Sequence, residues 1–275
     1  MKTYWVRIPK TGLWTVAAIG IFSLAAGALA LAASPQMGTL VRSTNRDAPD
    51  AEFHMVRLVY GGLASGFRGF SNRWWAIDYP DAEVHFLPAL SRLTNLSVAD
   101  DSRHLVVTDD RIFQYPFLFM QQPGQGNWNP SRLEAERLRE YLDRGGFLLV
   151  DDFHGNYDWY VFAMAMKKIY PNREIVEIPD DDVLMNIFFD LDDRIQIPGL
   201  RHLRRSSGGQ IVAAMQGAPH WRGIYDDRGR LVVAISFNID MGDAWEHADD
   251  AYYPAPMTGL AYRLGVNYVI YAMTH

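Results

Sequence analysis

The segment between Phe117 and Asp152 restricts the fold of this chain more than any other part of it. An apolar run, FLFMQ, is followed by a loop in which Ser131 and Glu134 have the spacing of a capping box, the side-chain pair that starts a helix. A Gly-Gly pair at 145–146 ends that helix, and the run FLLV at 147–150 is apolar throughout, as in a strand covered on both faces. A strand, a helix and a second strand in this order predict a parallel βαβ unit with a right-handed crossover.

Apolar runs and helical patterns alternate over the rest of residues 53–275. This alternation predicts a three-layer α/β/α domain with a mostly parallel central sheet. Residues 226–229 predict a turn that joins a strand at 230–237 to a partner strand at 211–215. One face of the central helix carries four apolar residues that we expect to be buried, namely Leu133, Leu138, Tyr141 and Leu142.

Composition excludes several classes of protein. The chain has 275 residues, of which 49% are hydrophobic and 21% charged, so it is too apolar to be a disordered chain. It contains no cysteine, which excludes disulfide scaffolds, thiolate zinc sites, iron–sulfur clusters and a cysteine nucleophile. A formal net charge of −6 argues against nucleic-acid binding, which needs a basic face.

The N-terminus predicts the compartment. Residues 1–10 contain three basic side chains and no acidic one, and residues 13–33 contain no charged side chain and end in alanines. This pattern is typical of a signal peptide, and the run is also long enough for an N-terminal membrane anchor, so both outcomes remain open. Residues 34–52 are polar and predict a linker. We therefore expect the domain at 53–275 to be extracytoplasmic, periplasmic or exported, and either secreted or anchored.

The first candidate site follows the strand at 147–150. Asp151, Asp152 and His154 come at its carboxyl end, where ligands bind in open α/β sheets. Two carboxylates and an imidazole can bind a divalent cation or share acid–base catalysis, so these three are the candidate catalytic residues. The alternative is structural: the two aspartates cap the next helix and His154 makes a local hydrogen bond.

A second polar loop follows the strand at 230–237. Its four candidate ligand-binding residues are Asp240, Asp243, Glu246 and His247, and Trp128 is a further candidate because a loop tryptophan can stack on a ligand or partner. The acidic loop is also compatible with an ordinary solvated turn. The chain has no EF-hand spacing and no HExxH, which excludes the calcium loop and the zincin. It also has no GxSxG, which argues against an ordinary serine hydrolase.

Four separated segments resemble the DUF4159 family of uncharacterised bacterial proteins: DYPDAEVHFLPALSRLTNLSV (78–98), YPFLFMQQPG (115–124), YLDRGGFLLVDDFHG (141–155) and GLAYRLGVNYVIYAMTH (259–275). The resemblance implies a class I glutamine-amidotransferase-like, flavodoxin-like fold and an exported or membrane-associated protein, but it brings no established reaction. In related amidotransferase-like folds, the central strand ends in a sharp turn, the elbow, which holds a catalytic cysteine. The elbow here, VDDFHG, contains no Cys, Ser or Thr, so we expect no amidotransferase activity.

These observations lead to three hypotheses, of which the third is a structural envelope protein. The first is an exported or membrane-anchored, non-catalytic domain that binds a ligand or an envelope protein partner, with the N-terminal segment holding it at the membrane if it is not cleaved. The second is a metal- or carboxylate-dependent hydrolase with its site at the 151–154 and 238–247 loops. A divalent cation is the one cofactor that the side chains suggest. What separates the first two hypotheses is whether Asp151, Asp152, His154 and Asp240 converge.

Overall fold

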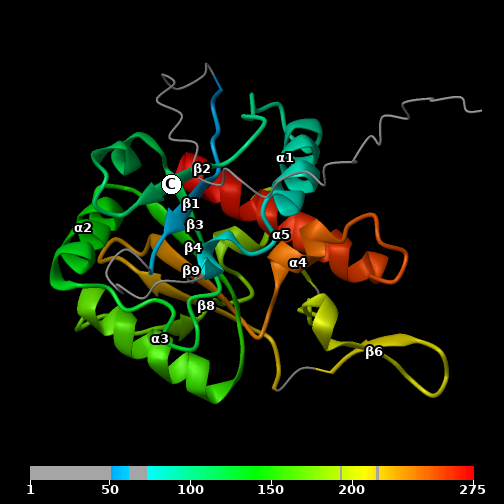
Figure 1. The fold of residues 1–275 in the computed structure, drawn as a ribbon. Coiled ribbons are helices and arrows are strands. Elements are labelled where there is room, and N and C mark those ends of the chain that lie inside the picture. The colour runs from blue at the N-terminus through cyan, green and yellow to red at the C-terminus, as the bar shows by residue number, and fades with distance from the viewer. Residues whose placement is uncertain (1–50, 62–72, 193, 215–216) are drawn as a thin grey trace, which may run out of the picture. The chain divides into compact units, whose positions relative to one another are not determined.

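The computed structural model describes residues 51–61, 73–192, 194–214 and 217–275 (Figure 1). The predicted leader at 1–33, and nearly all of the linker at 34–52, lie outside the described residues. The strands are β1 (Val56–Val59), β2 (Arg103–Val106), β3 (Phe117–Gln121), β4 (Phe147–Phe153), β5 (Val176–Glu177), β6 (Leu203–Arg205), β7 (Ile211–Ala213), β8 (His220–Tyr225) and β9 (Leu231–Phe237). The α-helices are α1 (Asp81–Leu93), α2 (Arg132–Asp143), α3 (Gly155–Ile169), α4 (Met241–Glu246) and α5 (Ala255–Thr274).

Seven strands form the central sheet in the order β2-β1-β3-β4-β9-β8-β5. The first five are parallel, and their order matches the flavodoxin-like order 2-1-3-4-5. β8 and β5 extend the sheet as antiparallel strands. The predicted βαβ unit is confirmed, because β3 and β4 pair in parallel with Phe117 opposite Phe147 and Gln121 opposite Asp151.

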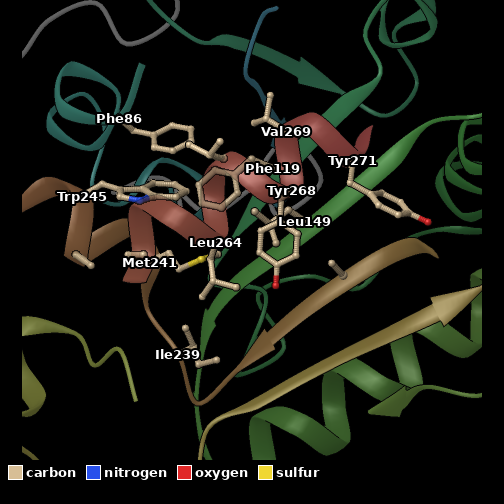
Figure 2. Packing of buried hydrophobic residues seen from close by; sticks show 14 of the residues in the cluster. Phe86, Phe119, Leu149, Ile239, Met241, Trp245, Leu264, Tyr268, Val269 and Tyr271 are labelled. Carbon is tan, nitrogen blue, oxygen red and sulfur yellow. The ribbon is translucent and has the colours of Figure 1, made fainter. Parts of the chain in front are cut away.

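Helices cover both faces of the sheet, which confirms the three-layer fold. α1, α4 and α5 pack on the face that receives Phe119 and Leu149, and α2 and α3 pack on the face that receives Leu118 and Leu148. Figure 2 shows the first of these interfaces. There the rings of Phe86 and Trp245 stack with centroids 4.2 Å apart.

The capping box at the start of α2 is confirmed. The backbone N–H of Glu134 donates to the Ser131 hydroxyl at 3.3 Å, and the Ser131 N–H donates to the Glu134 carboxylate at 2.7 Å. Leu138, Tyr141 and Leu142 are buried as predicted. The prediction for Leu133 is wrong, since its side chain is 58% exposed. Leu133 and Leu138 are five positions apart, which separates their side chains by about 140° around the helix axis. Leu133 therefore cannot lie on the face that carries Leu138.

The turn at 226–229 is also present, but the partner strand was misplaced. It connects β8 to β9, whereas β7 pairs with β6 in a separate two-stranded sheet. Trp221 and Ile224 of β8 are buried, and the polar and glycine residues between and beside them hid the strand pattern. β7 is only partly buried, so its apolar sequence did not mark a strand of the central sheet.

Candidate functional site

Three neighbouring parallel strands, β3, β4 and β9, end at the same edge of the sheet, and each has a polar residue there with a left-handed backbone. These residues are Gln122 with φ 47°, Asp152 with φ 55° and Asn238 with φ 57°. Residues other than glycine adopt this conformation at a cost in free energy, and such positions gather at functional sites. This edge is where the sequence placed both candidate loops.

The two aspartates of the elbow lie in an irregularity of β4. The pairing of β4 with β9 shifts register between Val150 and Phe153, so Asp151 and Asp152 form a bulge. Regular alternation sends adjacent side chains to opposite faces, whereas a bulge changes the direction of a side chain. The positive φ of Asp152 and the bulge together direct its carboxylate toward the loop that follows β9.

Asp151 is fully buried and binds the start of α4. Its Oδ2 accepts hydrogen bonds from the backbone N–H groups of Met241 at 2.8 Å and Gly242 at 3.0 Å. Its Oδ1 is buried without a hydrogen-bond partner. The alternative that Asp151 and Asp152 cap the helix after β4 is wrong, because the N-cap of α3 is His154 and no side chain caps it.

Asp152, His154 and Asp240 converge. His154 Nε2 lies 2.9 Å from Asp152 Oδ1, and one potential ligand atom from each of the three residues lies within 4.8 Å of the other two. Asp152 and Asp240 are 2% and 3% exposed, and the His154 imidazole is partly buried. Two carboxylates and an imidazole nitrogen at this spacing, from the end of β4 and the start of α4, can serve as ligands for a divalent cation.

Asp240 and Asp243 are fixed by the backbone around them. Asp240 is the N-cap of α4, and its Oδ1 accepts the Asp243 N–H at 3.0 Å. Asp243 Oδ2 accepts the backbone N–H of Leu200 at 2.7 Å. The residues on either side of Asp240, Ile239 and Met241, are both fully buried in the core under α5 (Figure 2). This packing fixes the position of the Asp240 carboxylate.

Sequence reasoning missed Asp78 and Gln121. Gln121 Nε2 donates to Asp78 Oδ2 at 2.6 Å, and both atoms lie so close to Gly242 that a Cβ there would meet them at 2.4 and 2.3 Å. The potential ligand atoms of Asp78, Asp240 and Asp243 lie within 4.8 Å of one another. Asp78 lies 43 positions from Gln121 in the chain, and no spacing motif connects them.

Glu246 is the last residue of α4, and His247 follows it directly. Both are half-buried and lie near Asp243. Trp128 does not join them. Its indole is 4% exposed and packs against Phe162 in the core under α2 and α3, away from the carboxylates. A buried indole in contact with the core has no free face on which a ligand could stack.

We use the term carboxylate cluster for six residues: Asp78, Asp151, Asp152, Asp240, Asp243 and Glu246. Desolvation, with a further contribution from the charge of Asp152, raises the pKa of Asp78, Asp151 and Asp240 well above the ordinary value. Desolvation also raises the pKa of Asp152 and Glu246. Among the described residues, Arg201 is the one lysine or arginine within 4 Å of the cluster, at 3.9 Å from Asp152 Oδ1. The cluster therefore requires protons or a cation to offset its charge.

The fold and this site define the class of the protein: an α/β domain of flavodoxin-like strand order with a carboxylate-rich centre at the carboxyl edge of its parallel strands. Residues 54–273 match the family described as Domain of unknown function (DUF4159). The chain therefore belongs to the DUF4159 family, as the four segments of its sequence indicated. No curated protein matches it. Among the described residues, no helix has both the length and the apolar composition that crossing a bilayer requires.

The raised pKa values predict how stability depends on pH. Asp78, Asp151 and Asp240 bind protons more tightly in the folded chain than in the unfolded one, where their pKa is near 3.8. In the presence of a chelator, the free energy of unfolding should therefore fall as pH rises above that value toward the folded pKa values. We expect added Mn²⁺ to restore stability most at the higher pH, because deprotonated carboxylates are the form that coordinates a cation. Thermal melting from pH 4 to pH 8, with chelator or Mn²⁺, measures both effects.

Proposed function

We propose that this chain is an exported or membrane-anchored domain that binds a ligand or protein partner through a divalent cation at the carboxyl edge of its sheet. The convergence of Asp152, His154 and Asp240 carries the proposal, because these residues come from two loops more than eighty positions apart in the sequence. We infer that the domain has no amidotransferase activity, because its elbow contains no Cys, Ser or Thr that could act as the nucleophile.

The charge balance of the cluster supports a cation more strongly than a purely structural role. A structural aspartate pairs with a basic side chain or with several N–H donors, as Asp151 Oδ2 does with Met241 and Gly242. Asp152 instead faces His154, with Arg201 only at 3.9 Å and its side chain 56% exposed. A divalent cation offsets the remaining negative charge and leaves coordination positions for an oxygen-containing ligand.

Calorimetric titration of the full-length chain in mild detergent, after treatment with a chelator, tests cation binding. We expect Mn²⁺ to bind to the parent chain. The variant Asp152→Asn/His154→Ala should bind it about 10–100-fold more weakly, because two ligands of one cation are removed. Asp249→Asn is the matched control, since Asp249 is 85% exposed and lies outside the cluster, and it should bind as the parent chain does. Unchanged binding by the double variant would overturn the assignment of the site.

A second candidate function is a metal- or carboxylate-dependent hydrolase. The contact that favours it is the 2.9 Å approach of His154 to Asp152, the geometry in which a carboxylate orients an imidazole for acid–base work. Assays of the Mn²⁺-loaded chain with chromogenic phosphomonoester, phosphodiester and carboxylic ester substrates separate the two functions. Turnover that His154→Ala abolishes would establish the hydrolase, and no glutamine hydrolysis is expected in either case.

The extracytoplasmic location remains part of the proposal, and the charge-free run at 13–33 with its basic flank supports it. Alkaline phosphatase fused to the C-terminus should be active, because that enzyme functions only outside the cytoplasm. Activity of a cytoplasm-only reporter in the parallel fusion, together with an inactive phosphatase, would contradict export.

A further inference from the structure

We propose that the site holds two divalent cations and that Asp240 is a ligand to both. This inference rests on the cation binding proposed above and adds a second position, formed by Asp78, Asp240 and Asp243. The first position is formed by Asp152, His154 and Asp240. In each group the potential ligand atoms lie within 4.8 Å of one another, and Asp240 belongs to both groups.

A shared carboxylate is the usual connection in two-metal sites, where the ions lie about 3.5–4 Å apart. Asp240 is suited to this role because its position is fixed. It caps α4 through Oδ1, and the residues on either side of it are fully buried. Gly199 also lies against it, since a Cβ at that position would meet Asp240 Oδ2 at 2.5 Å and Asp243 Oδ2 at 2.8 Å. The backbone of Gly199 thus closes over two of the carboxylate oxygens of the second position.

Two buried oxygens beside Asp78 provide an independent observation. Gln121 and Asp151 occupy paired positions on β3 and β4, so their side chains point to the same face of the sheet. Both residues are 0% exposed, and Gln121 Oε1 and Asp151 Oδ1 have no hydrogen-bond partner. Gln121 Nε2 donates to Asp78 Oδ2, and Asp151 Oδ2 accepts the N–H of Gly242, whose Cα lies against those same atoms of Gln121 and Asp78. Both side chains therefore lie beside the Asp78 carboxylate. Buried oxygen acceptors without donors favour a hard cation nearby.

A different group, Asp243, Glu246 and His247, also has the required spacing, but it fits a second cation less well. Its residues lie within or directly after the single short helix α4 and are all half-buried, so water can solvate their charges. Asp78 instead brings a carboxylate from a separate part of the chain against the fully buried Gln121.

The stoichiometry of Mn²⁺ tests the inference. The full-length chain in mild detergent is stripped with a chelator and then dialysed to equilibrium against Mn²⁺. We expect about two ions per chain, and electron paramagnetic resonance should show the coupled spectrum of a Mn²⁺ pair, because ions at two-metal distances interact magnetically. No bound Mn²⁺ would contradict the proposed function itself. One bound ion with an uncoupled spectrum would leave that function standing and overturn the second position.

Single substitutions assign the positions. His154→Ala and Asp78→Asn should each leave about one ion, whereas Asp240→Asn should lose both, although asparagine keeps the helix cap and the fold. Asp249→Asn is the matched control and should retain both ions. If Glu246→Gln loses one ion and Asp78→Asn retains two, the second cation lies on α4 and the inference is wrong. Circular dichroism of each variant confirms that a lost ion does not reflect unfolding.

Discussion

Replacing Glu83 by alanine should lower the free energy of unfolding by about 3–5 kcal/mol, because it leaves a buried arginine without its counter-ion. Glu83 and Arg57 are 2% and 0% exposed, and they form a two-point ion pair in which Arg57 Nη2 lies 3.0 Å from Glu83 Oε2. Arg57 belongs to β1 and Glu83 to α1, so the pair joins the sheet to the helix that covers it. Denaturant unfolding followed by tryptophan fluorescence measures the loss.

The same substitution should weaken the second cation position. Arg57 Nη1 also donates to the carbonyls of Trp75 at 3.2 Å and Ile77 at 2.8 Å, and Ile77 immediately precedes Asp78. The ion pair therefore holds the segment that carries the Asp78 carboxylate. Mn²⁺ stoichiometry of the Glu83→Ala chain under folding conditions should fall from about two toward one, while the position at His154 is retained.

The control for the predicted loss of stability is a surface ion pair that is also formed by a glutamate and an arginine. Glu136 and Arg132 lie 2.7 Å apart on α2, but their side chains are 51% and 92% exposed. Glu136→Ala should leave the denaturation midpoint almost unchanged, since water screens exposed pairs. An equal loss from the two substitutions would contradict the role assigned to the buried pair. The variant Arg57→Met/Glu83→Leu should recover part of the loss, because it leaves no unpaired buried charge, although the Trp75 and Ile77 carbonyls lose their donor.

Leu138→Ala should lower the free energy of unfolding by about 2–5 kcal/mol, because it removes buried methyl groups and leaves a cavity between α2 and the sheet. The Leu138 side chain is 1% exposed and belongs to the same apolar cluster as Leu118 and Leu148 of the two central strands. Urea unfolding, with the midpoint and slope fitted together, gives the change directly.

Leu133→Ala is a matched control on the same helix. Its side chain is 58% exposed, so the same substitution should change stability by less than about 0.5 kcal/mol. A large loss at Leu133 or a negligible one at Leu138 would contradict the packing of α2. Neither residue is in the carboxylate cluster, so Mn²⁺ binding by both folded variants should be unchanged.

The sequence predicted the fold wherever local signals and hydrophobic pattern agreed. Ser131 and Glu134 marked the start of α2, and the uniformly apolar run before Asp151 marked a central strand. The misplaced partner of β9 shows the limit of that pattern. β8 has a histidine, an arginine and a glycine between its apolar residues, and the burial of Trp221 and Ile224 depends on packing against segments distant in the sequence.

The sequence by itself placed each candidate loop at the carboxyl end of an apolar strand, where ligands bind in open α/β sheets. That β4 and β9 run parallel side by side, and so bring both loops to one edge, is a finding of the tertiary structure. Only the tertiary structure decided which side chains meet there. The bulge and the positive φ of Asp152 redirect a carboxylate that regular alternation sends to the other face. Asp78 joins the cluster through contact with Gln121, 43 positions away, and Trp128 is lost from it because its indole packs in the core. Periodicity reports local geometry, whereas these contacts depend on how distant segments pack.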